Sequence, residues 1–436
     1  MKRRKHNGSR FRKWFVSIII LGVVVSVPIL LGIFRQSSVS KEIEIPLTDA
    51  EMQALIPRGQ ELALAGDCFG CHSLPNGAMG VGGVAINMPV GTIYSTNITP
   101  DKQYGIGNYT RADFHRALKD GIGQQGNLYP AMPFVFTHLT TSDDLDALYA
   151  YMMSIPPLAV PNKENTGVFT LPVRPFLNFW TLLNFPDRQF PMNPERTDAW
   201  NRGAYLVEGL AHCGACHSPR NFMMGVEFDK ALTGGFVDDL AIPNITAESL
   251  SQKGFSLSSL TEYLHTGVSP EGDSFAGMNT VTHFSTSQMA QSDVMAMANY
   301  LLTDSQGQLL SPKVAPKPLA IIEEKPLEDR MLNGRLNYIA ACSSCHGMNG
   351  SGIPNVVPAL QGDGIVMMEN PQTLISVILH GLATTTYTNQ QRYYAMPSFS
   401  DRMSDQNIAD LVVWLRAEWG GQATPISAKD IAKEKK

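Results

Sequence analysis

Apolar and polar positions follow one another along the chain in a pattern that predicts three similar groups of helices. Each group opens with a short helical stretch, continues through a Gly/Pro-rich loop to a second apolar helix, and closes with an amphipathic helix. The opening helices are expected at 58–65, 202–210 and 334–341, the middle helices at 114–121, 260–267 and 374–381, and the closing helices at 143–153, 292–302 and 405–419. The sequence therefore predicts a mainly α fold built from three tandem repeats.

A separate apolar stretch lies near the N-terminus. Residues 14–34 carry no charge, and about 20 apolar residues are enough to cross a bilayer. A cleaved signal peptide is the alternative, but its apolar core is shorter and its cleavage site needs small residues, and no Ala lies between Trp14 and Thr48. We expect an uncleaved transmembrane helix, with the basic segment before it in the cytoplasm and the repeats on the periplasmic side of a bacterial inner membrane.

Pro-rich stretches separate the repeats and set the expected boundaries. The expected order is a basic segment 1–13, a membrane anchor 14–34, a linker 35–55, domain 1 at 56–155, a Pro-rich linker 156–198, domain 2 at 199–305, a Pro-rich linker 306–327, domain 3 at 328–422 and a charged tail 423–436 that we expect to be solvated.

All six cysteines occur in one motif, which each repeat carries once. The motif is Cys-x-x-Cys-His, and its members are Cys68, Cys71 and His72, then Cys213, Cys216 and His217, then Cys342, Cys345 and His346. Two thiols three positions apart on a helical turn point the same way, and the following imidazole is then placed to bind a metal. Cys-x-x-Cys-His is the attachment signature of c-type haem, so the sequence predicts three covalent haems c.

Other uses of cysteine fit this pattern less well. Paired Cys-x-x-Cys units can bind zinc, but three pairs leave one unmatched and do not explain the histidines. A redox-active dithiol needs one such pair on a thioredoxin-like scaffold, and structural disulfides do not require a following histidine.

A sixth iron ligand is expected from methionine, because Met/His coordination suits electron transfer. Met132 and Met396 both lie in Ala-Met-Pro segments before a closing helix, and the proline favours an extended backbone at the methionine. Met278 has the corresponding position in the second repeat without a following proline; Met289, Met295 and Met297 are the alternatives there. Three six-coordinate irons would leave no open coordination site, so we expect no catalytic residues.

Charged residues are unevenly distributed along the chain, and their distribution argues against one class of partner. Seven of the 34 Lys and Arg residues lie in the first 13 positions, so the rest of the chain carries 27 basic and 39 acidic side chains. An acidic body argues against binding to nucleic acid, which requires clustered positive charge.

Several longer segments resemble a known family. They are Gly-Thr-Ile-Tyr-Ser-Thr-Asn-Ile-Thr-Pro at 91–100, Gly-Ile-Gly-Asn-Tyr-Thr at 105–110, Leu-Tyr-Pro-Ala-Met-Pro at 128–133, Arg-Gly-Ala-Tyr-Leu-Val-Glu at 202–208 and Cys-Gly-Ala-Cys-His-Ser-Pro-Arg at 213–220. With them, the chain resembles the triheme cytochrome c subunits of membrane-bound bacterial dehydrogenases for alcohols, aldehydes and sugar acids such as gluconate. Asn-x-Thr at 97–99 and 244–246 fits a glycosylation pattern, but we expect both segments to order loops beside the haems.

The resemblance implies three tandem cytochrome c domains that carry electrons from a periplasmic catalytic subunit to ubiquinone in the membrane. That subunit would hold pyrroloquinoline quinone, FAD or molybdopterin, and a small third subunit is a further partner left open. Members that serve pyrroloquinoline-quinone alcohol dehydrogenases usually have a cleavable signal peptide, so the expected anchor leaves the partner's identity open. The alternatives are a stand-alone membrane-anchored carrier that supplies a terminal oxidase, and a haem enzyme such as a peroxidase.

Overall fold

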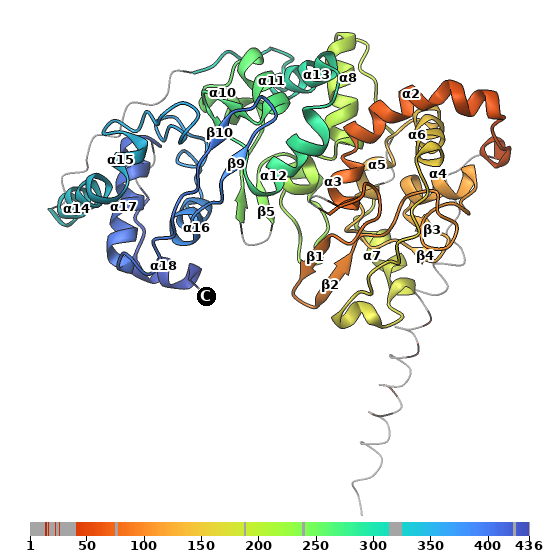
Figure 1. The fold of residues 1–436 in the computed structure, drawn as a ribbon, viewed down its shortest axis with the longest axis horizontal. Coiled ribbons are helices and arrows are strands. Elements are labelled where there is room, and N and C mark those ends of the chain that lie inside the picture. Colours follow the sequence, from red (N-terminus) through yellow and green to blue (C-terminus); the bar gives the residue numbers. More distant parts are fainter. Residues whose placement is uncertain are drawn as a thin grey trace, which may run out of the picture. The chain divides into compact units, whose positions relative to one another are not determined.

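The structure is a computed structural model that describes residues 14, 16, 22, 26, 41–74, 77–186, 189–237, 240–313, 325–421 and 424–435. These residues are mainly helical, with short two-stranded hairpins (Figure 1). They divide into two compact units. The first comprises the chain up to Leu62 together with Cys71–Phe190, and the second comprises Ala63–Gly70 and the chain from Pro191 onward.

The proposed anchor at 14–34 lies outside the described residues except for four single positions, and most of the linker at 306–327 also lies outside them. In the part of the chain that is described, no helix has the length and apolarity required to cross a bilayer.

The first repeat contains the expected opening, middle and closing helices and two short hairpins. Its elements are α2 (Asp49–Ala65), α3 (Cys68–His72), β1 (Ala85–Met88), β2 (Gly91–Tyr94), α4 (Arg111–Asp120), β3 (Ile122–Gly123), β4 (Gly126–Asn127), α5 (Phe134–Thr137) and α6 (Ser142–Ser154). Both hairpins are antiparallel, with Ala85 opposite Tyr94 and Ile122 opposite Asn127.

The second repeat has the same order with one additional helix. Its elements are α8 (Asp198–Tyr205), α9 (Gly214–His217), β5 (Gly235–Val237), β6 (Leu240–Ile242), α10 (Ala247–Gln252), α11 (Leu257–Thr266), β7 (Val268–Ser269), β8 (Gly272–Asp273), α12 (Ala276–Val281) and α13 (Gln291–Leu301). The first hairpin pairs Gly235 with Ile242, and the second pairs Val268 with Asp273.

The third repeat has a single short hairpin and ends in a helix that the sequence did not predict. Its elements are α14 (Lys325–Ala341), α15 (Ser343–His346), α16 (Gln372–His380), β9 (Thr385–Thr386), β10 (Arg392–Tyr393), α17 (Asp405–Glu418) and α18 (Ala428–Glu434). Its buried core is drawn mainly from α16 and α17, with Tyr338 of α14.

A close crossing of the opening and closing helices occurs in all three repeats. A Cβ added to Gly59 would lie 1.9 Å from the carbonyl oxygen of Ala147, and one added to Gly203 would lie 1.9 Å from that of Ala296. At Gly334 the corresponding distance, to the carbonyl oxygen of Asp410, is 2.3 Å. Only glycine permits such an approach, so the glycine in each opening helix is explained by the crossing.

An aromatic residue and an ion pair accompany each crossing. The aromatic residues are Tyr151, Tyr300 and Trp414, whose Cβ atoms lie beside the three glycines. The pairs join the same two helices: Arg58 to Asp144 at 3.0 Å, Arg202 to Asp293 at 2.7 Å and Arg330 to Asp410 at 2.6 Å. The recurrence of glycine, aromatic and arginine–aspartate pair shows that the three repeats share one helix arrangement.

Two expected boundaries are wrong. Helix α2 begins at Asp49, inside the segment 35–55 expected to be a linker, because Thr48 and Glu51 cap each other through reciprocal backbone contacts of 2.7 and 3.3 Å. The charged tail 423–436 is not fully solvated. Its α18 buries Ile431, and Ile426 just before it is also buried, both in the core of the third repeat.

The apolar part of the first Pro-rich linker forms α7 (Leu177–Asn184), which belongs to the first unit. Its ring contacts lie within that unit, since Trp180 meets Phe134 edge to face at 6.3 Å and Phe185 lies 5.9 Å from the same ring. The buried side chains of α7 are polar, among them Thr181, whereas Phe179, Leu182 and Leu183 are exposed.

We expect Gly203→Ala to destabilise the protein by at least about 2 kcal/mol, because the new methyl group would overlap the carbonyl of Ala296. The midpoint of thermal unfolding, followed by circular dichroism, measures the change. Gly277→Ala is the matched control, since a Cβ there meets nothing within 4 Å. Equal unfolding midpoints for the two variants would contradict the close crossing.

Candidate haem sites

The three Cys-x-x-Cys-His motifs have the same local structure. The first motif fills α3, whereas α9 and α15 begin one residue after the first cysteine, with Cys213 and Cys342 at their N-caps. In each pair the first cysteine is half-buried and the second is exposed. Each repeat therefore places two cysteines three positions apart on a short helical turn, the spacing that attachment of a porphyrin requires.

The histidine of each motif is oriented by a backbone carbonyl. Nδ1 of His72 lies 2.6 Å from the carbonyl oxygen of Thr96. The corresponding distances are 2.8 Å from His217 to Pro243 and 3.0 Å from His346 to Pro358. A carbonyl only accepts, so Nδ1 carries the proton and donates it, which leaves Nε2 with a lone pair for a metal.

Burial keeps these imidazoles neutral. It lowers the pKa of His72 and of His346 below the usual value, and it lowers that of His217 to about 4. A neutral imidazole is the form that binds a metal ion.

The Asn-x-Thr segments fix two of these carbonyls. Asn97 is buried and directly follows Thr96, whose carbonyl accepts the hydrogen bond from His72. Oδ1 of Asn97 accepts a hydrogen bond from the backbone N of Thr99 at 2.9 Å. Asn244 accepts from the backbone N of Thr246 at 2.8 Å in the same way, after Pro243. The segments thus order the loops that hold the histidines, as we expected.

The three proposed methionine ligands lie in different backbone settings. Met132 lies in a bend before α5, and Met396 pairs with Leu382 in an antiparallel bridge through contacts of 3.0 and 2.9 Å. Met278 lies in α12, on a helix rather than in a loop. The structure therefore supplies an extended Met segment in the third repeat and a helical one in the second.

In the third repeat, the attachment motif and the methionine pack against the same core. Cys342 and Met396 are both partly buried against the core that contains Tyr338 and Trp414. The alternatives to Met278 differ from one another: Met289 and Met297 are buried, whereas Met295 is exposed.

One cation near the second histidine was not singled out from the sequence. Lys253 donates from Nζ to the carbonyl of Asn244 at 2.8 Å, next to the carbonyl that orients His217. Its charge contributes to the lowered pKa of His217, and burial lowers its own pKa to about 8. It follows α10, the additional helix of the second repeat, so the environment of this histidine differs from the other two.

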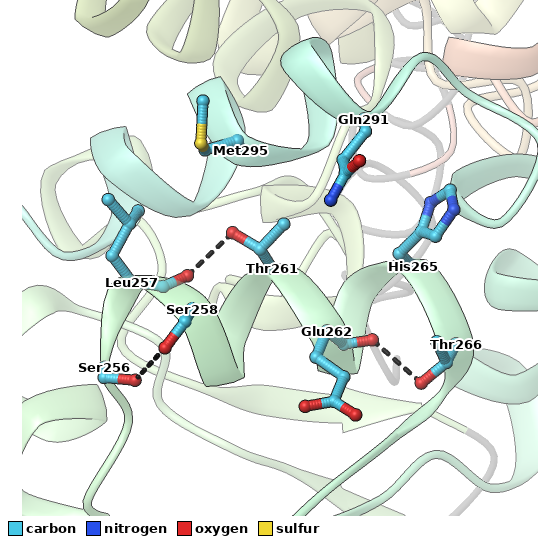
Figure 2. A pocket seen from close by; sticks show the side chains of 9 residues that line it. All are labelled: Ser256, Leu257, Ser258, Thr261, Glu262, His265, Thr266, Gln291 and Met295. Atoms are coloured by element: carbon cyan, nitrogen blue, oxygen red, sulfur yellow. Dashed lines mark hydrogen bonds between the residues drawn. The ribbon is translucent and has the colours of Figure 1, made fainter.

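An open pocket lies elsewhere on the second repeat, between α11 and the start of α13 (Figure 2). It is lined by side chains that include Thr261, His265 and Gln291, and by Met295, one of the alternatives to Met278, but by none of the six cysteines and by neither His217 nor Met278. His265 lies 3.2 Å from the carbonyl of Thr286, a contact within the repeat. This pocket is therefore distinct from the haem sites.

The residues present fit haem c. Each repeat offers paired thiols for two thioether bonds, an imidazole with an available Nε2 and a methionine in the following segment. When bound, the haem supplies one-electron chemistry between Fe(III) and Fe(II), and the protein sets its potential through the ligands and their surroundings.

Comparisons with known proteins agree with this chemistry. The model of the cytochrome c family matches residues 332–419. The alcohol dehydrogenase (quinone) cytochrome c subunit of Gluconacetobacter polyoxogenes is 35% identical over 399 residues, which cover 87% of this chain and 84% of the relative. The gluconate 2-dehydrogenase cytochrome c subunit of Pantoea cypripedii is 34% identical over 407 residues, which cover 89% of this chain and 91% of the relative.

A further relative is much longer. A nicotinate dehydrogenase subunit of Pseudomonas putida is 37% identical over 368 residues, which are 83% of this chain but only 30% of that protein. Similarity over nearly the whole length of two cytochrome c subunits, together with the attachment motifs, shows that this chain belongs to the family of dehydrogenase cytochrome c subunits.

Proposed function

We propose that the chain carries three haems c and passes electrons from a dehydrogenase catalytic subunit through them to ubiquinone. The observation that carries this proposal is the threefold recurrence of the Cys-x-x-Cys-His turn, each with its histidine Nδ1 bonded to a carbonyl. Methionine as the second axial ligand on each iron, from Met132, Met278 and Met396, would raise the potentials and leave no site for substrate.

The relatives support an electron-transfer role within a complex. They are named as cytochrome subunits of alcohol, gluconate and fructose dehydrogenases, and the name of the alcohol dehydrogenase includes quinone. The substrate differs from one relative to the next, so the substrate of this chain's partner and the partner's cofactor (pyrroloquinoline quinone, FAD or molybdopterin) stay open within the proposal.

The proposed location follows from the sequence. The uncharged stretch 14–34, preceded by seven basic residues, would anchor the chain in the inner membrane with the haem repeats in the periplasm. An anchor would keep the haems near the quinone pool.

We expect the denatured chain to retain three haems, because thioether bonds survive unfolding. Mass spectrometry should find the polypeptide heavier by three haem groups, and replacing both Cys213 and Cys216 with serine should remove about one third of the haem absorbance. Full loss of colour into acidified organic solvent would contradict covalent attachment.

We expect Met278→Leu to lower the potential of one haem, because loss of the thioether ligand removes the Met contribution to a high potential. Redox titration followed by visible spectroscopy measures the shift. Met289→Leu is the matched control from the buried core of the same repeat, and its potentials should equal those of the wild type. A shift in Met289→Leu alone would assign the ligand to Met289 instead.

We expect the detergent-solubilised full chain to copurify with a larger dehydrogenase subunit and, with that subunit's substrate, to reduce a ubiquinone analogue. Replacing His217 should abolish or strongly slow quinone reduction while substrate oxidation with an artificial acceptor continues, because only the route through the haems is broken. A chain that purifies without a partner and instead reduces a terminal oxidase would favour the stand-alone carrier.

A further inference from the structure

A group of acidic and phenolic side chains, of which Asp363 and Tyr387 are buried, lies where the loops of the second and third repeats meet, within the second unit. Tyr387, between β9 and β10, places its Oη 2.9 Å from Oδ2 of Asp273 in β8 and 3.1 Å from the carbonyl of Ser274. Thr388 also reaches α11 of the second repeat, where its Oγ1 lies 3.4 Å from the carbonyl of His265. The hairpin of the third repeat thus closes over the acidic end of β8.

A second carboxyl group lies beside the first. Oδ1 of Asp363 accepts from the backbone N of Ile365 at 2.9 Å and of Val366 at 3.2 Å, and the side chain is only 7% exposed. Its Oδ2 lies 3.4 Å from the position of a Cβ on Gly272, the residue before Asp273. Two carboxyl groups from different repeats therefore share one poorly solvated space.

The surroundings contain further acids and phenols. The backbone N of Gly364 donates to the carbonyl of Glu271 at 3.1 Å, and Oε2 of Glu271 is buried with no hydrogen-bond partner among the described residues. Tyr263 of α11 and Tyr393 of β10 both interact with the two aspartates. In the described part of the chain, no lysine or arginine contributes to the perturbation of either carboxyl group, so no positive charge balances them.

This environment favours protonation near neutral pH. Burial raises the pKa of Asp363 to about 7, with the charge of Asp273 adding to the effect. Burial also raises the pKa of Asp273 to about 6, against the hydrogen bond from Tyr387, which lowers it. Burial raises the pKa of Tyr393 to about 12 and that of Tyr263 and Tyr387 further, so the phenols stay neutral.

The helix arrangement shared by the repeats does not require this group. In the first repeat, β4 ends in Asn127 at the place where β8 ends in Asp273, and the amide Nδ2 of Asn127 donates to the carbonyl of Arg174 at 3.0 Å. The hairpin of the first repeat therefore has a neutral side chain at the position where the second repeat has the aspartate.

The group also lies close in sequence to both of the later proposed methionine ligands. Asp273 precedes Met278 by five residues, and Tyr393 precedes Met396 by three. Reduction of Fe(III) to Fe(II) removes one positive charge, so a carboxylate nearby opposes reduction and its protonation relieves that opposition. Since the coupling between two binding equilibria is reciprocal, reduction must in turn favour protonation.

We propose that Asp273 and Asp363 form a proton-binding site at the junction of the second and third repeats, and that it takes up a proton when a haem of these repeats is reduced. One electron from the dehydrogenase converts Fe(III) to Fe(II), and one proton from solvent binds a carboxylate; both leave when the haem is reoxidised. This inference rests on the proposed electron-transfer function. It adds that a proton is bound when the haem is reduced and released when the haem is reoxidised.

The test is a redox titration of the full chain with its haems, in detergent, from about pH 5 to about pH 8. The equilibrium constant for reduction of at least one haem should fall as pH rises, by up to tenfold per pH unit, which is about 59 mV for one electron. Asp363→Asn and Asp273→Asn should each weaken this pH dependence, and the latter restores the residue type of the first repeat. Glu248→Gln, a neutralised exposed acid of the second repeat, is the matched control and should titrate as the wild type does.

Tyr387→Phe separates a titrating role from a structural one. Without the phenol's hydrogen bond, Asp273 should hold its proton to a higher pH, so the pH-dependent region should move upward rather than disappear. Thermal unfolding of the oxidised protein gives an independent measurement. The pKa of Asp363 in the folded protein lies above its ordinary 3.8, so the free energy of unfolding should fall as the pH rises toward about 7. Asp363→Asn has no carboxyl group to ionise there, so its free energy of unfolding should fall less over the same range.

Potentials that stay constant with pH in the wild type, or that keep the full slope in both asparagine variants, would overturn the proton site. If the haems still accept electrons from the partner and pass them to quinone in that case, the proposed function stands. If the partner fails to reduce the haems at all, the proposed function fails first.

Discussion

The close contact between an opening and a closing helix is the constraint on which each repeat depends. Glycine at 59, 203 or 334 lets one backbone reach the carbonyl of the other helix, and an aromatic residue and an ion pair then fix the two helices at that point. The attachment turn begins eight to ten residues after the glycine of this crossing. The direction of the thiols and of the histidine is therefore set by backbone packing, which exists before any haem is considered.

Backbone atoms of the loops around the histidines orient the three imidazole rings. Carbonyl groups of Thr96, Pro243 and Pro358 select the tautomer of the three imidazoles. The side chains of Asn97 and Asn244 hold two of those loops in shape, while the third repeat achieves the same contact without an Asn-x-Thr segment. The repeats thus keep one ligand geometry but differ in nearby charge, with Lys253 beside His217 and the acidic group between the second and third repeats.

Features that depend on the spacing of nearby residues could be predicted from the sequence. Features that depend on contacts between distant residues could not. The opening, middle and closing helices and the Cys-x-x-Cys-His motifs follow from short-range patterns, and the structure contains helices at all of these places. Met278 has no following proline that would break a helix, and it lies in α12. The start of α2 was missed although Thr48 and Glu51 have the spacing of a capping box. Asp273 and Asp363 are ninety positions apart, so no local pattern could bring them together.

The small helix α18 has a consequence for how the third repeat is completed. Ile426 and Ile431 come from the last eleven residues of the chain, yet both are fully enclosed by residues that precede them by many positions. Lys435 adds a contact to the carbonyl of Ser400 at 3.1 Å and an ion pair with Asp405. Since both isoleucines follow α17 in the chain, the interior of this repeat stays partly open until the segment after α17 folds back onto it, so a cut between α17 and α18 should loosen the third repeat and leave the cores of the first two intact.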